Sequence, residues 1–228
     1  MTAYRPALRP LALLAAAALA ACAPAAAADT SFAAPGAARV ADEGSGLKTA
    51  YFAGGCFWGV EAVFSHVQGV TSAVAGYHGG DARTASYDSV SSGRTGHAEA
   101  VRVTYDPAVV RYDQLLRVFF SVVADPTLTD RQGPDVGSQY RAALIPVTAE
   151  QRAVAAAYLA QMRSSGVWAR PIVTPMEGAR QFFAAEDYHQ DFALHHPDHG
   201  YIRRWDAPKV AALARMYPDL YRASFRAG

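Results

Sequence analysis

The sequence predicts an α+β fold in which helices pack on a mostly antiparallel sheet to form two layers. Strand-like and helix-like segments follow one another as β-α-β-β-α-β-α-β, which is neither the regular alternation of a parallel βαβ sheet nor the run of strands in a sandwich. The chain has 228 residues, 51% of them hydrophobic, so it can bury a substantial core. We therefore expect one domain with extensions.

The first predicted strand covers 48–55, KTAYFAGG, and ends at two glycines. A helix follows directly, because its apolar residues recur with the i, i+3, i+4, i+7 spacing of one helical face. These residues are Val60, Val63, Phe64 and Val67. Cys56 is thus expected at the turn where the strand ends and the helix begins.

The middle of the chain, residues 70–147, is predicted to contain three strands, a helix and a loop. Two strands are predicted at 70–80, which closes on glycines, and at 97–107, which alternates and stops at Asp-Pro. A helix over 112–123 places its apolar side chains on one face. The segment 125–139 is dense in Pro, Gly and Asp and is predicted as a loop, and 140–147 is predicted as a strand.

The last third begins with a helix over 148–166. Thr148 followed three residues later by Gln151 is typical of a helix N-terminal capping box. We expect a strand at 171–177, a helix at 186–194, and a terminal helix or tail at 206–222.

The first residues differ in kind from the rest. Basic residues precede an apolar run that is too short for a transmembrane helix, which predicts a signal peptide over 1–21. Leu19-Ala20-Ala21-Cys22 resembles a lipobox, in which Cys22 would carry lipid and become the mature N-terminus; ordinary cleavage after Ala28 is the alternative. Both predict an exported, periplasmic protein, and lipidation would anchor it to a membrane.

The segment 22–46 is rich in Ala, Gly and Pro and is predicted to be a flexible tether. The folded catalytic domain is then expected over 47–228. The chain carries 21 Lys and Arg against 20 Asp and Glu, and the signal would remove two arginines. No net basic charge remains to recruit nucleic acid, so we exclude that class of partner.

Cys56 is the only cysteine of the predicted domain, since Cys22 is the only other one in the chain. A helix N-terminus stabilises negative charge, so it should lower the thiol pKa and favour the nucleophilic thiolate. A small buried hydrophobic side chain is the alternative. The glycines before Cys56 favour the reactive interpretation.

Glu99 lies in the strand predicted at 97–107. Alternation puts it on the same face as Val101, Val103 and Tyr105, so burial should raise its pKa and keep a proton available near neutral pH. A strand-end Glu that bends into solvent is the alternative.

Several aromatic residues are ambiguous by pattern alone. Tyr87 and Tyr140 could donate hydrogen bonds or simply pack, and Phe57 and Trp58 could line a pocket or fill the core. The histidines of 195–199 lack a further ligand at metal-site spacing, so we expect no metal.

Four segments together resemble the A-class peptide-methionine (S)-S-oxide reductases and cover most of 48–200. They are GGCFWGVE, YDSVSSGRTGHAEAVRVTYDP, DVGSQYRAALIP and AEDYHQDF, in the order and approximate spacing of that family. The resemblance implies an α/β roll with a ferredoxin-like sheet. It also implies reduction of the S-epimer of methionine sulfoxide, in proteins, in peptides or free, by a monomer without a cofactor.

The resemblance further implies a role for each matched residue: Cys56 as nucleophile, Glu99 as proton donor, Tyr87 and Tyr140 binding the sulfoxide oxygen, Asp135 supporting them, and Phe57 and Trp58 receiving the methyl group. A protonated carboxyl and hydroxyl donors would stabilise charge on the departing oxygen.

The chain departs from the family at two positions. Ser91 and Ile202 stand where many relatives carry cysteines, so no second thiol of the fold can resolve oxidised Cys56. We expect an external reductant, either a thioredoxin-like or glutaredoxin-like protein or a small thiol.

Two other functions fit parts of the sequence. A cysteine hydrolase would pair Cys56 with His97 or His189 as base. A non-catalytic exported binding protein would use the aromatic residues beside Cys56 as a pocket.

Overall fold

The computed structural model describes Met1 and residues 32–228. Its main sheet has five strands in the order β6-β1-β3-β2-β7, and every neighbouring pair is antiparallel. These strands are Lys48–Gly54 (β1), Val70–His78 (β2), Ala98–Tyr105 (β3), Ala142–Ile145 (β6) and Phe182–Ala184 (β7). Two short strands, Arg131–Gln132 (β4) and Asp135–Val136 (β5), pair separately as a small hairpin.

The α-helices of the described residues are Phe57–Ser65 (α1), Tyr87–Val90 (α2), Tyr112–Val118 (α3), Ala149–Ser164 (α4), Phe192–His195 (α5) and Ala207–Met216 (α6). Two π-helical turns extend them, Phe119–Val123 (η2) after α3 and Ile202–Asp206 (η5) before α6. Short 3-10 turns lie at Ala82–Thr84 (η1), Ser138–Tyr140 (η3) and Asp187–His189 (η4).

One face of the sheet carries the main core. Phe52 of β1 stacks on Phe64 of α1 with ring centroids 4.7 Å apart and packs on Phe119 of η2 at 5.3 Å. Buried residues of α3, α4 and α6 belong to the same cluster. The opposite face holds small residues such as Ala100 and Ala143 beneath the stacked rings of Tyr51 and Phe182. The two-layer α+β class is confirmed.

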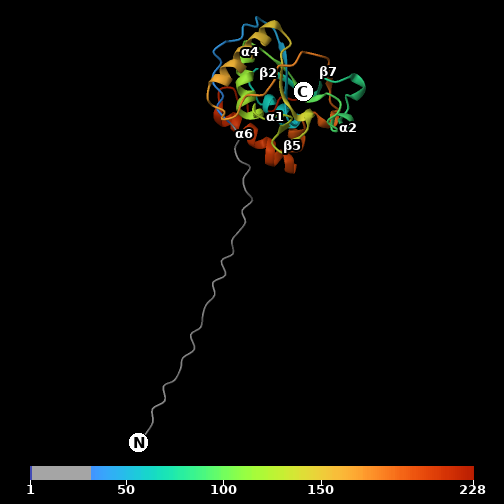
Figure 1. Cartoon of the computed structure of the whole chain (residues 1–228), viewed down its shortest axis with the longest axis vertical. Helices are drawn as coiled ribbons and strands as arrows, with labels where there is room; N and C mark the ends of the chain where they lie inside the picture. Colours follow the sequence, from blue (N-terminus) through green and yellow to red (C-terminus); the bar gives the residue numbers. More distant parts are fainter. Residues whose placement is uncertain (2–31) are drawn as a thin grey trace.

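The C-terminal helix packs beside the helix that starts at Cys56. Figure 1 shows α6 next to α1, and the two elements are in contact. Gly59 of α1 permits this approach, because a Cβ atom there would lie 2.1 Å from Oδ1 of Asp206. Residues from the two ends of the domain thereby meet near Cys56.

The predicted strands at 48–55, 70–80, 97–107 and 140–147 are confirmed. The predicted helix at 112–123 is present as α3 and η2. The side chain of Thr148 accepts a hydrogen bond from the backbone N–H of Gln151, as the capping pattern predicts, and α4 follows.

Three local predictions are wrong. The segment 171–177 forms no strand and makes a single bridge from Met176 to Leu144, since its two prolines lack the N–H groups that a ladder needs. The helix expected at 186–194 is broken by Asp191, whose φ of 53° is left-handed. Strand β7 was not predicted; it pairs with β2 at the edge of the sheet.

The tether predicted over 22–46 also needs correction where the structure describes it. Residues 32–46 lie on the domain: Ala34 is buried and its N–H donates to Oγ of Ser121. Glu43 accepts hydrogen bonds from the hydroxyl of Tyr105 and the N–H of Tyr112. The folded unit therefore begins before residue 47, because these polar contacts bind the segment even though its composition lacks periodicity.

The predicted signal peptide and Cys22 lie outside the described residues. Among the helices that the structure describes, none combines the length and the hydropathy needed to cross a bilayer.

Candidate active site

Cys56 occupies the turn between β1 and α1, as the sequence predicts. Gly55 precedes it with φ of 93°, a conformation that favours glycine, and a Cβ atom there would lie 2.6 Å from Cβ of Gln132. Cys56 is the N-cap residue of α1, with φ −52° and ψ 123°, and is 9% exposed. The strand and the helix thus hold the thiol at a fixed, nearly enclosed position.

The surroundings of Cys56 overturn the expectation of a lowered pKa. Burial raises the pKa of the thiol, and the carboxylates of Glu99, Asp206 and Asp135 raise it further. The backbone N–H of Trp58 acts in the opposite direction and is outweighed. The helix N-terminus alone predicts a thiolate, whereas the folded site keeps the thiol protonated until charge near it changes.

Glu99 lies on β3 opposite Tyr77 of β2 and points to the helical layer, where it is 2% exposed. Its Oε2 accepts a hydrogen bond of 2.9 Å from the backbone N–H of Phe57. Burial raises the pKa of Glu99 to about 8; that hydrogen bond lowers it and Asp135 raises it. The carboxyl is therefore neutral at pH 7, and the solvent-facing alternative is wrong.

Tyr87 and Tyr140 come from two different loops of the chain and meet near Glu99. Tyr87 begins α2 and Tyr140 ends η3. Burial and then the charge of Glu99 raise the pKa of both phenols, and the charge of Cys56 acts on both as well. Within residues 32–228 neither hydroxyl has a hydrogen-bond partner, so both can donate to a bound molecule.

The hydroxyl of Tyr201 donates a hydrogen bond to Oδ2 of Asp135. Sequence reasoning missed Tyr201, although it lies directly before Ile202, the position compared with the family's cysteine. The ring of Tyr201 also meets Trp58 edge to face at 5.9 Å. Tyr201 thus links Asp135 to the aromatic side of the site.

The two aromatic residues after Cys56 have different environments. Phe57 is 1% exposed and packs in the core against Tyr77. Trp58 is half-buried and stacks on Phe192 with centroids 3.8 Å apart and an interplanar angle of 5°. Its Nε1–H donates to Nδ1 of His189 at 3.2 Å. The indole therefore stands rigidly beside Cys56.

Glu186 is a second residue that sequence reasoning missed, although it lies in the AEDYHQDF segment. Its carboxylate accepts hydrogen bonds from the hydroxyl of Tyr77 at 2.7 Å and from the N–H of Tyr87 at 2.9 Å. Burial raises the pKa of Glu186, but these hydrogen bonds outweigh it and hold the pKa below its ordinary value. Glu186 thus positions the start of α2, and with it the phenol of Tyr87.

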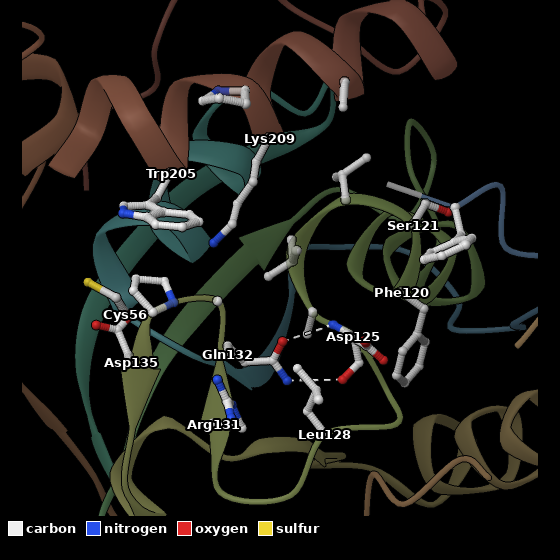
Figure 2. Close-up of a pocket in the computed structure, with 18 of the residues that line it drawn as sticks. Cys56, Phe120, Ser121, Asp125, Leu128, Arg131, Gln132, Asp135, Trp205 and Lys209 are labelled. Atoms are coloured by element: carbon white, nitrogen blue, oxygen red, sulfur yellow. Dashed lines mark hydrogen bonds between the residues drawn. The ribbon is translucent and has the colours of Figure 1, made fainter. Parts of the chain in front are cut away.

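A cavity of about 400 Å³ adjoins Cys56. It lies between the segment that runs from η2 to β5 and the segment that runs from η5 to α6. Figure 2 shows Cys56 and Asp135 together at one end, with Trp205 and Lys209 on the α6 side and Gln132 across from them.

The histidines of the hydrolase alternative are engaged elsewhere. In His97, Nδ1 accepts a hydrogen bond from the N–H of Gly80, and Nε2 lies 3.0 Å from the carbonyl oxygen of Asp81. Nδ1 of His189 accepts a hydrogen bond from Nε1–H of Trp58. The charged side chains that shift the pKa of Cys56 are carboxylates and not histidines. This arrangement does not support a cysteine–histidine pair. In the described part of the chain, no cluster of three or more His, Cys, Asp or Glu side chains is placed to hold a metal ion.

Comparison of the sequence with known proteins identifies a family that the chain matches. The family model for peptide methionine sulfoxide reductase matches residues 48–219. The chain is 49% identical over 176 residues to peptide methionine sulfoxide reductase MsrA 2 of Mesorhizobium japonicum, covering 77% of this chain and 90% of that one. It is 48% identical over 179 residues to MsrA of Deinococcus radiodurans, covering 78% and 86%.

Solved structures agree with the sequence relatives. Reduced Mxr1 from Saccharomyces cerevisiae superposes with a TM-score of 0.59 at 30% identity, covering 69% of this chain and 90% of that one. Methionine sulfoxide reductase A of Corynebacterium diphtheriae superposes with a TM-score of 0.56 at 31% identity, covering 68% and 77%.

Proposed function

The chain belongs to the peptide methionine sulfoxide reductase family and reduces methionine sulfoxide with a thiol. We propose that Cys56 is the nucleophile of this reaction and that Glu99 is the proton donor. The observation that supports these roles best is the convergence of a buried thiol, a neutral carboxyl and two phenol hydroxyls that have no hydrogen-bond partner among residues 32–228. Cys56 follows β1, Glu99 lies on β3, and Tyr87 and Tyr140 come from the loops.

The chemistry follows from the protonation states. The sulfur of Cys56 attacks the sulfoxide sulfur while Glu99 supplies a proton to the sulfoxide oxygen. Tyr87 and Tyr140 donate hydrogen bonds to that oxygen as negative charge develops on it. The S–O bond of the sulfoxide breaks, the oxygen passes with the proton from Glu99 to the sulfur of Cys56, and the thiol proton restores the Glu99 carboxyl, which leaves Cys56 sulfenic acid and methionine. A carboxyl with a pKa of about 8 holds its proton at neutral pH and can release it to the oxygen.

We propose the S-epimer as substrate because four segments of the chain resemble the A-class peptide-methionine (S)-S-oxide reductases. Trp58, stacked on Phe192, presents an apolar surface that can accept the methyl group, and Phe57 lies in the core.

Regeneration requires a thiol from outside the domain. Cys56 is the only cysteine of the described residues, and Ser91 and Ile202 offer no sulfur. The sulfenic acid therefore reacts with an external thiol to give a mixed disulfide, which a second thiol reduces.

A single-turnover measurement tests the proposal. The domain is mixed with a peptide containing methionine sulfoxide, without reductant, using each epimer in turn. We expect about one equivalent of methionine from the S-epimer, a sulfenic acid at Cys56 that dimedone traps, and none from Cys56→Ser. Methionine formation by Cys56→Ser, or equal consumption of both epimers, would contradict the assignment.

We propose that the enzyme is a monomer. For the cellular location we propose export to the periplasm and a lipid on Cys22. The support is the short apolar run after two arginines and the Leu-Ala-Ala-Cys sequence. Mass spectrometry of the mature N-terminus distinguishes lipidated Cys22 from cleavage after Ala28, which would leave Asp29 first. Sedimentation of the soluble domain tests the monomer.

A further inference from the structure

The cavity beside Cys56 shares only part of its wall with the candidate active site. Cys56 and Asp135 belong to its wall, whereas Glu99, Tyr87 and Tyr140 do not. Figure 2 shows Cys56 and Asp135 at one end of the cavity and Phe120 and Ser121 of η2 at the other. Most of this cavity therefore lies away from the side chains proposed to donate to the sulfoxide oxygen.

The charged side chains of the cavity wall are mostly basic. It contains four cationic side chains against the two carboxylates Asp125 and Asp135; the cations are Arg131, Arg170, Arg204 and Lys209.

Part of this charge is already neutralised. Asp125 pairs with Arg170 at 3.1 Å, and Lys209 lies 3.4 Å from Asp206. Arg131 is exposed and has no ion pair within the described residues, and Arg204 lies over the ring of Trp205. Positive charge thus remains available to an anionic ligand.

We propose that this cavity binds the reductant of oxidised Cys56, and that the reductant is a small thiol carrying carboxylates. The inference rests on the proposed function, which makes Cys56 a sulfenic acid that only an external thiol can reduce. A volume of about 400 Å³ is in the range of small-molecule sites and suits a thiol peptide of two or three residues. Because Cys56 is only 9% exposed, a small thiol reaches it more readily than one on a folded protein.

Two molecules of the thiol reduce the Cys56 sulfenic acid in the cavity. The sulfur of the bound thiol attacks Sγ of Cys56, an S–S bond forms, the S–O bond breaks, and the hydroxyl leaves as water with the thiol proton. A second molecule of the thiol attacks the outer sulfur, releasing the oxidised small disulfide and restoring the Cys56 thiol. The carboxylates of the first thiol are held by Arg131 and Arg204 during both steps.

The test compares three thiols on enzyme oxidised by one turnover: anionic glutathione, neutral dithiothreitol and cationic cysteamine. The rate at which each restores the Cys56 thiol is measured for Arg131→Glu and Arg204→Glu. Arg163→Glu is the matched control, because Arg163 is an exposed residue of the last turn of α4 and its substitution changes the net charge equally.

We expect Arg131→Glu to lower the rate of reduction by glutathione about tenfold at low salt. The rate with dithiothreitol should stay within about twofold of the parent, and the rate with cysteamine should rise. Arg204→Glu should act in the same direction, and Arg163→Glu should change none of the three rates. Equal effects on all thiols, no effect, or an equal effect of the control would overturn the proposal. So would reduction by a thioredoxin-like protein that is far faster than glutathione and insensitive to Arg131→Glu.

The same experiment separates this proposal from the proposed function. Methionine released in the oxidising turnover reports the first step, and Arg131→Glu should leave it unchanged. A lower methionine yield in this variant would assign the cavity to the sulfoxide substrate and refute the reductant site. No methionine from the unsubstituted enzyme would instead refute the proposed function.

Discussion

Substitution of Glu99 by Gln removes the acidic proton of this side chain and keeps its shape nearly unchanged. Gln has nearly the same volume and keeps an oxygen that can accept the hydrogen bond from the N–H of Phe57, which is 2.9 Å from Oε2 in the structure. It cannot supply an acidic proton. Loss of a positioned general acid typically slows a reaction about 10²- to 10⁴-fold, so single-turnover methionine release should fall within that range.

The same substitution should change how stability depends on pH. In the folded chain burial raises the pKa of Glu99 from 4.5 to about 8. Between these values the folded state binds more protons than the unfolded state, so the free energy of unfolding decreases as pH rises. Each unit of pKa difference corresponds to about 1.4 kcal/mol. From pH 6 to pH 9 the part due to Glu99 is about 2.5 kcal/mol, and Glu99→Gln removes it.

Urea unfolding at pH 6 and pH 9, together with single-turnover rates, measures both effects. Glu61→Gln is a matched control, because burial also raises the pKa of Glu61 to about 8, yet this side chain does not act on Cys56. Both variants should lose less stability than the parent between the two pH values. Only Glu99→Gln should lose activity.

Two results would refute this reasoning. If Glu99→Gln kept the parent rate, Glu99 would not be the proton donor. If its stability changed with pH as steeply as that of the parent, the carboxyl would be ionised in the folded state at neutral pH.

Three further substitutions test other parts of the structure. Tyr140→Phe should lower kcat/KM about 10- to 100-fold without changing unfolding, because it removes one donor to the developing charge; an unchanged kcat/KM would exclude that donor. Gly59→Ala should destabilise the domain by about 1–3 kcal/mol in urea, since the new Cβ would collide with Asp206, and a stability equal to the parent would show that α6 can shift freely. Glu43→Ala should cost about 1–3 kcal/mol by leaving the buried hydroxyl of Tyr105 without its acceptor, whereas a stability within 0.5 kcal/mol of the parent, on the order of an ordinary surface change, would restore the tether interpretation.

Local patterns predicted the elements that present the reactive groups. Alternation along 98–105 places Glu99 on the same face as three buried apolar residues, and the structure buries it there. The helical spacing after Cys56 predicts α1 and the N-cap position of the thiol. Local patterns failed at 171–177 and 186–194, where prolines and a left-handed Asp191 interrupt the chain.

The sequence by itself determined the two-layer class, the turn that holds Cys56 and the absence of a second thiol in the domain. Each of these depends on composition or on neighbours within a few residues, which periodicity reports. Only the tertiary structure decided the direction of the Cys56 pKa, the link from Tyr201 to Asp135, and the cavity against α6. These depend on desolvation and charge from segments far apart in the chain, and packing alone brings such segments together.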